Sequence, residues 1–146
     1  MSKTTALFLS STNGNVAFVK NGNVKLYSNG STQFDTLTID IDGDGVNLSK
    51  DVMIGVHLEL QNAGVILNDQ DLTMADLSTI EGANTSQYIQ TNGEGELIRP
   101  VADTDVTFPI GNSSYNPIIL NNNGGTADFY GARVEDQLLE NVTNRD

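Results

Sequence analysis

The sequence contains no cysteine, no tryptophan and a single histidine, and it has only 7 basic residues against 19 acidic ones. The absence of cysteine excludes a disulfide scaffold and a thiolate metal site. The net charge of -12 makes nucleic acids and anionic membrane surfaces unfavourable partners, because both carry negative charge. No apolar run approaches the roughly 20 residues that a membrane-spanning helix needs. We therefore expect neither a nucleic-acid partner nor membrane insertion.

The N-terminal residues do not match a secretory signal peptide. Only four consecutive apolar residues, 6–9, lie near the start of the chain, whereas the apolar core of a signal peptide needs about seven. Export would therefore depend on a signal that lies outside this sequence. The length of 146 residues predicts one domain, or one domain with part of a second.

What the sequence does contain is a repeat of short apolar segments separated by turn-forming residues. Residues 12–35 comprise three eight-residue units with Asn-Gly at the same position in each: TNGNVAFV, KNGNVKLY and SNGSTQFD. Apolar and polar residues then alternate as far as Met74, for example in the series Ile54, Val56, Leu58. A period of two is typical of β-strands, whose successive side chains point to opposite faces. Asn, Gly and Asp between the strands are residues that tolerate turn conformations.

The strands of this repeat are short, about three to five residues, and strands of this length need several neighbours to be stable. A chain that coils meets that need by stacking each strand on its counterpart in the next coil. The sequence therefore predicts an all-β fold, with a parallel β-helix-like β-solenoid over residues 1–98. A β-rich segment over residues 99–146 is expected to form a β-hairpin or a partial β-sandwich. The alternative is an antiparallel β-sandwich, because Asn-Gly between strands also favours tight hairpins.

In the second half of the chain, strands are expected at residues 88–90, 106–110, 117–120 and 128–134. The Arg99-Pro100 pair is expected to end a strand, because proline lacks the backbone donor that a β-ladder uses.

Two segments of this half carry a resemblance to a known family. Residues 86–101 read SQYIQTNGEGELIRPV, and residues 107–134 read TFPIGNSSYNPIILNNNGGTADFYGARV. With the strands from Phe34 onward, about two thirds of the chain resembles a β-solenoid and β-sandwich module of large secreted or cell-surface proteins of Bacteroidetes. The resemblance implies an extracellular module of a longer polypeptide, of the kind that the type IX secretion route exports, with a structural or adhesive role.

The chain departs from that family pattern in one respect. Further sandwich strands, often with a tryptophan, follow this segment in the family, whereas this chain has no tryptophan and ends at Asp146. The C-terminal part is therefore expected to be an incomplete sandwich. An unpaired edge of this kind accepts a strand from a neighbouring subunit. The alternative is that the chain is a fragment or a processed form of a larger protein, which the missing signal peptide favours.

One loop has the spacing of a calcium site. Asp40, Asp42, Asp44 and Asp51 occupy positions 1, 3, 5 and 12 of a calcium loop, and Gly45 occupies position 6. The flanking segments read as strands and not as the helices of an EF-hand, and the last ligand is Asp where Glu is usual. The alternative is a strand with its carboxylates on the solvent face, followed by a Gly-Asp-Gly turn. Calcium at these four residues is the one metal or cofactor that the sequence suggests.

No catalytic constellation is evident. His57, the only histidine, alternates with apolar neighbours and is expected to point away from the core. β-Helix enzymes that cleave acidic polysaccharides need a base and several charge-neutralising groups. Between Lys25 and Arg133, Lys50 and Arg99 are the only basic residues. We therefore do not expect an enzyme.

The sequence predicts a non-catalytic extracellular or cell-surface module with a structural or adhesive role, assembling into fibres through exposed β-edges. Its expected partners are other protein subunits or flanking domains of the same polypeptide. The alternative is a calcium-dependent module that binds surface glycans.

Overall fold

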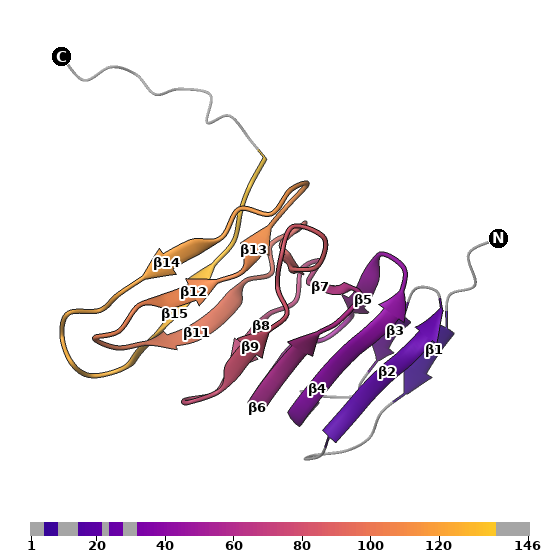
Figure 1. The fold of residues 1–146 in the computed structure, drawn as a ribbon, viewed down its shortest axis with the longest axis horizontal. Helices are drawn as coiled ribbons and strands as arrows, with labels where there is room; N and C mark the ends of the chain where they lie inside the picture. The colour runs from indigo at the N-terminus through magenta and orange to yellow at the C-terminus, as the bar shows by residue number, and fades with distance from the viewer. Residues whose placement is uncertain (1–4, 9–14, 22–23, 28–31, 137–146) are drawn as a thin grey trace.

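The computed structural model describes residues 5–8, 15–21, 24–27 and 32–136, with side chains from residue 33 onward. Every regular element in these ranges is a β-strand, so the predicted all-β class is confirmed. The strands stack along the long axis of the molecule, from β1 and β2 at one end to a lobe formed by β11, β12, β14 and β15 at the other (Figure 1).

Two large sheets run the length of the stack. Sheet A contains six parallel strands, in spatial order β1 (Thr5–Phe8), β3 (Val24–Tyr27), β5 (Gly45–Leu48), β7 (Gly64–Ile66), β10 (Ile89–Gln90) and β13 (Ile110–Gly111). Sheet B contains β2 (Asn15–Asn21), β4 (Thr32–Asp42), β6 (Val52–Leu60), β8 (Leu72–Met74), β11 (Leu97–Val101) and β15 (Asp128–Ala132), with β9 (Thr79–Glu81) also paired to β6. All pairs in sheet B are parallel except β11 with β15.

The chain passes alternately from one sheet to the other, and this defines the coil. Val46 of β5 pairs with Val65 of β7, 19 residues later, and Val65 pairs with Ile89 of β10 after 24 more. Parallel partners one coil apart are the mark of a β-solenoid, which confirms the solenoid and not the antiparallel sandwich for this part of the chain. Asn15 of β2 pairs with Thr36 of β4, 21 residues later, so more than one eight-residue unit of the sequence is needed to complete a coil.

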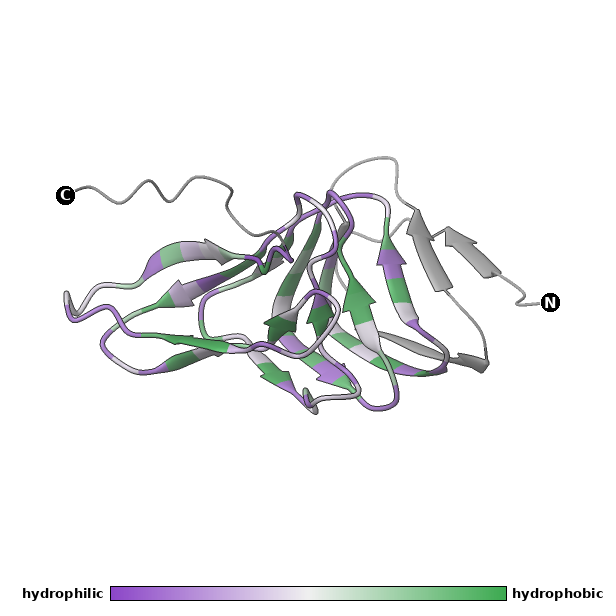
Figure 2. Cartoon of the chain, turned by 90° about the horizontal axis from the view of Figure 1, so that it is seen from above, coloured by the Kyte–Doolittle hydropathy of each residue, from purple (hydrophilic) through white to green (hydrophobic). Residues whose placement is uncertain are grey.

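The core consists of aliphatic side chains stacked in columns from coil to coil. The column in sheet A consists of Val46, Val65, Ile89 and Ile110. The two columns in sheet B are Phe34, Ile54 and Met74, and Leu37, Leu58 and the partly buried Ile80. Apolar and polar residues alternate along the strands, as the colouring in Figure 2 shows. Burial of these columns between the sheets is the main favourable contribution to the folding of this chain.

The alternation is interrupted at one bend in the coil. The pairing of β4 with β6 shifts by one residue between Phe34 and Thr36, and β6 pairs with two separate strands of the next coil, β8 and β9. Val56 lies at this bend and is 56% exposed, although the sequence pattern groups it with the buried Ile54 and Leu58. The prediction for Val56 was wrong because the bulge adds one residue to β6 here and leaves Val56 exposed, whereas Leu58 and Leu60 beyond it are buried as the pattern predicts.

Side-chain hydrogen bonds also link successive coils at their corners. Asp71 N donates to Asp51 Oδ1 at 3.0 Å, and Glu96 N donates to Asp71 Oδ1 at 3.0 Å in the following coil. At a second corner, Asn68 N donates to Asn92 Oδ1 at 2.9 Å, and Asn68 Nδ2 donates to the carbonyl of Leu48 at 3.0 Å. These ladders satisfy backbone donors that the turns would otherwise leave without a partner.

The C-terminal part, where a hairpin or a partial sandwich was expected, contains the antiparallel strand pairs of the described residues. β12 (Val106–Phe108) and β14 (Ile118–Leu120) form a two-stranded antiparallel sheet, and β15 pairs antiparallel with β11. The boundary expected after residue 98 lies inside β11, which pairs with the solenoid strand β8 through Leu97 and Ile98. The two segments therefore share sheet B.

The expectation that Arg99-Pro100 ends a strand was wrong, because β11 continues to Val101. Pro100 pairs with Phe129 of β15, while on the other side β11 pairs with β8 only as far as Ile98. Proline is accepted in a strand where its nitrogen does not face a ladder partner. The end of the β8 pairing provides such a position.

Candidate functional site

The predicted calcium loop forms a strand and a turn. β4 runs through Asp40 to Asp42, and β5 begins at Gly45. Gly45 has a φ of 137°, which glycine adopts without strain. Ile39 and Ile41 are buried in this strand. The alternative interpretation, a strand followed by a Gly-Asp-Gly turn, therefore describes this segment.

The four predicted ligands do not gather at one point. Asp40 accepts a hydrogen bond from Asn62, while Asp51 is engaged in the corner ladder with Asp71. Asp44 precedes the four residues of β5 and Asp51 follows them, so about 13 Å of strand separates the two corners. Within the part of the chain that the structure describes, no three His, Cys, Asp or Glu side chains lie close enough to hold a metal ion. Calcium binding stays a prediction.

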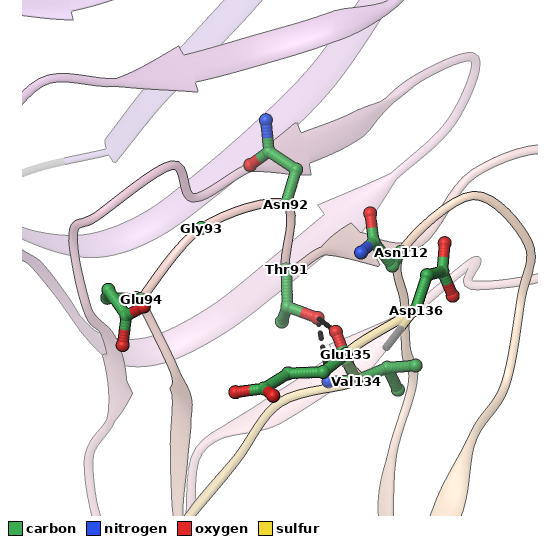
Figure 3. A pocket seen from close by; sticks show the side chains of 8 residues that line it. All are labelled: Thr91, Asn92, Gly93, Glu94, Asn112, Val134, Glu135 and Asp136. Carbon is green, nitrogen blue, oxygen red and sulfur yellow. Dashed lines mark hydrogen bonds between the residues drawn. The ribbon is translucent and has the colours of Figure 1, made fainter. Parts of the chain in front are cut away.

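An open groove of about 440 Å³ lies between the solenoid and the chain that follows β15 (Figure 3). Its lining is mostly polar and comprises Thr91, Asn92, Gly93, Glu94, Asn112, Val134, Glu135 and Asp136. The carboxylates of Glu94 and Glu135 both pair with the guanidinium of Arg133, whereas the carboxylate of Asp136 lies apart and accepts a hydrogen bond from Ser113 N at 3.3 Å (Figure 3). Histidine, lysine and cysteine are absent from this lining, so the groove offers neither a histidine–nucleophile pair nor a thiolate.

Thr91 is the most informative residue of this groove, because its polar side chain is 1% exposed. Its Oγ1 accepts a hydrogen bond from Val134 N at 2.9 Å and also lies 3.3 Å from the carbonyls of Val134 and Gly111 (Figure 3). The hydroxyl thus fastens the segment after β15 to the end of β10. This use of the hydroxyl is structural, and sequence inspection missed it because the two partners are 43 residues apart.

Arg133 holds the same segment from the outside. Its guanidinium forms ion pairs with Glu94 and with Glu135. The hydrogen bond with Glu94, together with the neighbouring carboxylates, raises the pKa of Arg133 above its ordinary value. Because the two carboxylates are exposed, the pairs contribute little to stability.

Arg99 lies between the two layers of the C-terminal lobe. Its Nη1 donates to the carbonyl of Thr107, and its guanidinium carbon lies 6.0 Å from the centre of the Phe108 ring. The Nε atom is buried and has no hydrogen-bond partner among the described residues. Burial lowers the pKa of this guanidinium. A cavity of about 210 Å³ beside it is bordered by Leu77, which is 91% exposed.

The lobe is open at its outer end. On β11, Leu97 and Val101 are fully buried, but Tyr130, which pairs with Arg99 on the same face, is 39% exposed. On the facing layer, Ile118 pairs with the buried Phe108 and is 38% exposed. The inner faces of the outermost strands are therefore only partly covered by the described residues, as expected for an incomplete sandwich.

His57 lies on the outer face of sheet B, as predicted. Its Nδ1 is 2.7 Å from Oγ1 of Thr79 in the next coil. Thr36 is its partner in the preceding coil, so threonine hydroxyls flank it along the stack. The His57 side chain thus links two successive coils through the hydroxyl of Thr79 on the outer face of the sheet.

No protein-family model, curated protein or solved structure matches this chain. The resemblance to secreted modules of Bacteroidetes stays a prediction from the sequence. In the described residues, no helix is long and apolar enough to span a membrane.

Proposed function

We propose that this chain is a non-catalytic structural or adhesive module that assembles with neighbouring subunits through open β-edges. The observation that carries the proposal is the pairing of sheet B. β2 pairs only with β4, and β15 pairs only with β11, so both outermost strands present an edge without a described partner. Open edges of this kind are templates for strand addition by another chain.

The chemistry of the described surface supports a non-catalytic role. In the groove beside Thr91, the carboxylates of Glu94 and Glu135 are paired with Arg133, and the Thr91 hydroxyl is occupied in fastening the chain. Arg99 is the one basic residue of the second cavity, and it is bound to a backbone carbonyl. A stack of coils buries one continuous aliphatic core and leaves its outer faces and end strands available for contacts with other chains.

The extracellular or cell-surface location belongs to the same proposal. Its support is the resemblance of residues 34–134 to secreted modules and the polar turns between the strands. Flanking domains of a longer polypeptide would meet the same edges as separate subunits do. Calcium-dependent glycan binding, the alternative from the sequence, is not favoured by any contact in the described part of the chain.

Sedimentation velocity of the purified chain over a concentration series tests the proposal. We expect a shift from monomer to larger species, with slower amide exchange in β2 and β15 than in the dilute protein. Exchange in the exposed turn 121–126 serves as the internal control and should not change. A chain that stays monomeric up to its solubility limit, with unchanged exchange at both edges, would overturn the proposal.

A further inference from the structure

The two ends of the solenoid differ in how their sheets are closed. At the C-terminal end of sheet A, the outer side of β13 is covered, because Asn116 N donates to the carbonyl of Ile110 at 2.9 Å and Tyr115 bridges to Gly111. In sheet B, by contrast, β15 has no described partner beyond β11. Sheet B is thus the one large sheet with an open described edge at both ends, β2 and β15.

These two edges carry opposite charge. Residues 1–34 contain three lysines and no acidic residue, which gives a net charge of +3. All 19 acidic residues lie in 35–146 together with four basic ones, which gives a net charge of -15. Lys20 lies in β2 itself, and Asp128 lies in β15. Near β15, residues 94–136 contain seven acidic and two basic residues.

Like charges disfavour contact between two copies of the same end. A contact between two β2 edges would join two basic segments, and a contact between two β15 edges would join two acidic ones. A lysine on an edge strand is a common means of preventing such self-pairing. The contact between β2 of one copy and β15 of another is the one that joins opposite charges, so the charge distribution selects this pairing.

The directions and lengths of the strands also agree with this contact. β2 runs parallel to β4 and, through the ladder, to β11, whereas β15 runs antiparallel to β11. A second copy added along the stack axis keeps its winding sense, so its β2 would run antiparallel to β15. Antiparallel pairing is slightly the more stable of the two arrangements. The seven residues of β2 are enough to pair with all five of β15.

We infer that the neighbouring subunit is a second copy of this chain, joined head to tail, with its β2 added to β15. This inference rests on the proposed function, and it identifies the neighbouring subunit that the proposed function requires. A head-to-tail contact uses two different surfaces, so it leaves one free β2 and one free β15 on every assembly. Because these lie at opposite ends of the long axis, addition continues along that axis and gives an open fibre (Figure 1).

Disulfide crosslinking is the direct test, because the chain contains no cysteine of its own. One variant carries Ala17→Cys or Val19→Cys in β2, and the other carries Phe129→Cys in β15, where the native side chain is 56% exposed. The full chains are mixed and oxidised. We expect disulfide-linked dimers in the mixture and few in either variant alone, since the bond forms only when the Cα atoms approach within about 7 Å.

Ile119→Cys on β14 is the matched control, because this residue is 63% exposed but lies on a different sheet. Crosslinking of β2 to Ile119→Cys in place of Phe129→Cys would overturn the inference, as would dimers of the β2 variant with itself. The proposed function survives these two results, because a larger species would still form. A chain that is monomeric at every concentration overturns both the head-to-tail inference and the proposed function.

Salt and charge reversal give an independent readout. We expect association to weaken between about 0.05 M and 0.5 M salt, because salt at these levels screens exposed charges. Lys20→Glu should weaken it by at least about two-fold, as the loss of an exposed ion pair does, and adding Asp128→Lys to the same chain should restore it. Association that is indifferent to salt and to both reversals would contradict a contact selected by charge.

Discussion

The carboxylate of Asp51 accepts a hydrogen bond of 3.0 Å from the backbone nitrogen of Asp71, the residue at the same corner one coil later. Asp71 repeats this contact with Glu96 N. The pair shows how the solenoid propagates, because each corner side chain satisfies a backbone donor of the coil that stacks upon it. The stability of the stack should therefore depend on corner carboxylates as well as on the aliphatic core.

Replacement of Asp71 by alanine tests this ladder. Asp71→Ala leaves Glu96 N without its acceptor and should lower the free energy of unfolding by about 1 kcal/mol. Asp71→Asn keeps an acceptor oxygen and should cost less. Urea denaturation measures both, with Asp103→Ala at an exposed carboxylate as the control. Equal stability of Asp71→Ala and Asp103→Ala would show that the ladder contributes nothing.

Leu58 tests the aliphatic columns, because it is fully buried between Leu37 and Ile80 of the adjacent coils. Leu58→Ala should lower the free energy of unfolding by about 2–5 kcal/mol, through lost burial and the cavity left behind. Val56→Ala, two residues away in the same strand, removes methyl groups from an exposed side chain and should change stability by about 0.5 kcal/mol or less. Similar losses of stability in the two variants would contradict the assignment of Leu58 to the core and of Val56 to the surface.

Gly64 tests how closely the coils approach. A Cβ at this position would lie 2.0 Å from the carbonyl oxygen and 2.9 Å from the nitrogen of Tyr88 in the next coil. Gly64→Ala should therefore push β7 away from β10 and cost roughly 1–3 kcal/mol. Gly55→Ala is the control, because its Cβ would meet nothing closer than 3.3 Å, the flexible side chain of Asp35. Thermal melting measures the stability of both variants. A Gly64→Ala variant that melts at the same temperature as the native chain would refute the close approach of the coils.

Thr91→Val removes the hydroxyl that fastens Val134 while keeping the shape of the side chain. Both backbone groups of Val134 lose their partner, so the loss should be roughly 1–3 kcal/mol, and the amide of Val134 should exchange faster with solvent. Thr91→Ser keeps the hydroxyl and should retain slow exchange. Fast exchange in both variants, or in neither, would exclude the proposed role of the hydroxyl.

Calcium binding at the predicted loop is tested by melting in millimolar calcium and in chelator. An ion held by Asp40, Asp42 and Asp44 raises the melting temperature, by an amount equivalent to about 2.7 kcal/mol at a hundred times its Kd. Asp42→Asn should reduce that rise. Asp51→Asn should leave the rise unchanged, because β5 separates Asp51 from the other three carboxylates. A native chain with no calcium-dependent shift excludes the site.

Some features of the candidate surfaces could be predicted from the sequence. The incomplete sandwich and its open edge were predicted from residues 86–134, and the structure has partly exposed inner residues, Ile118 and Tyr130, at that end. The roles of Thr91 and Arg99 were not predicted, because each depends on which backbone carbonyl or amide lies opposite in space. A recurrence of Asp and Asn at spacings of 20 to 25 residues was the available signal for the corner ladders.

The sequence by itself determined that this chain forms short strands. A period of two and turn residues at regular intervals act locally, so strand positions such as those around Leu37 and Val46 follow from neighbouring residues alone. The tertiary structure decided which strands pair, where the coil bends, and which carboxylates come together. Those outcomes depend on partners about 20 residues apart, and a single bulge near Val56 exposes that residue although Ile54 and Leu58 on either side of it are buried. Asp44 and Asp51 are seven residues apart in the chain but lie at different corners, because an extended strand carries one away from the other.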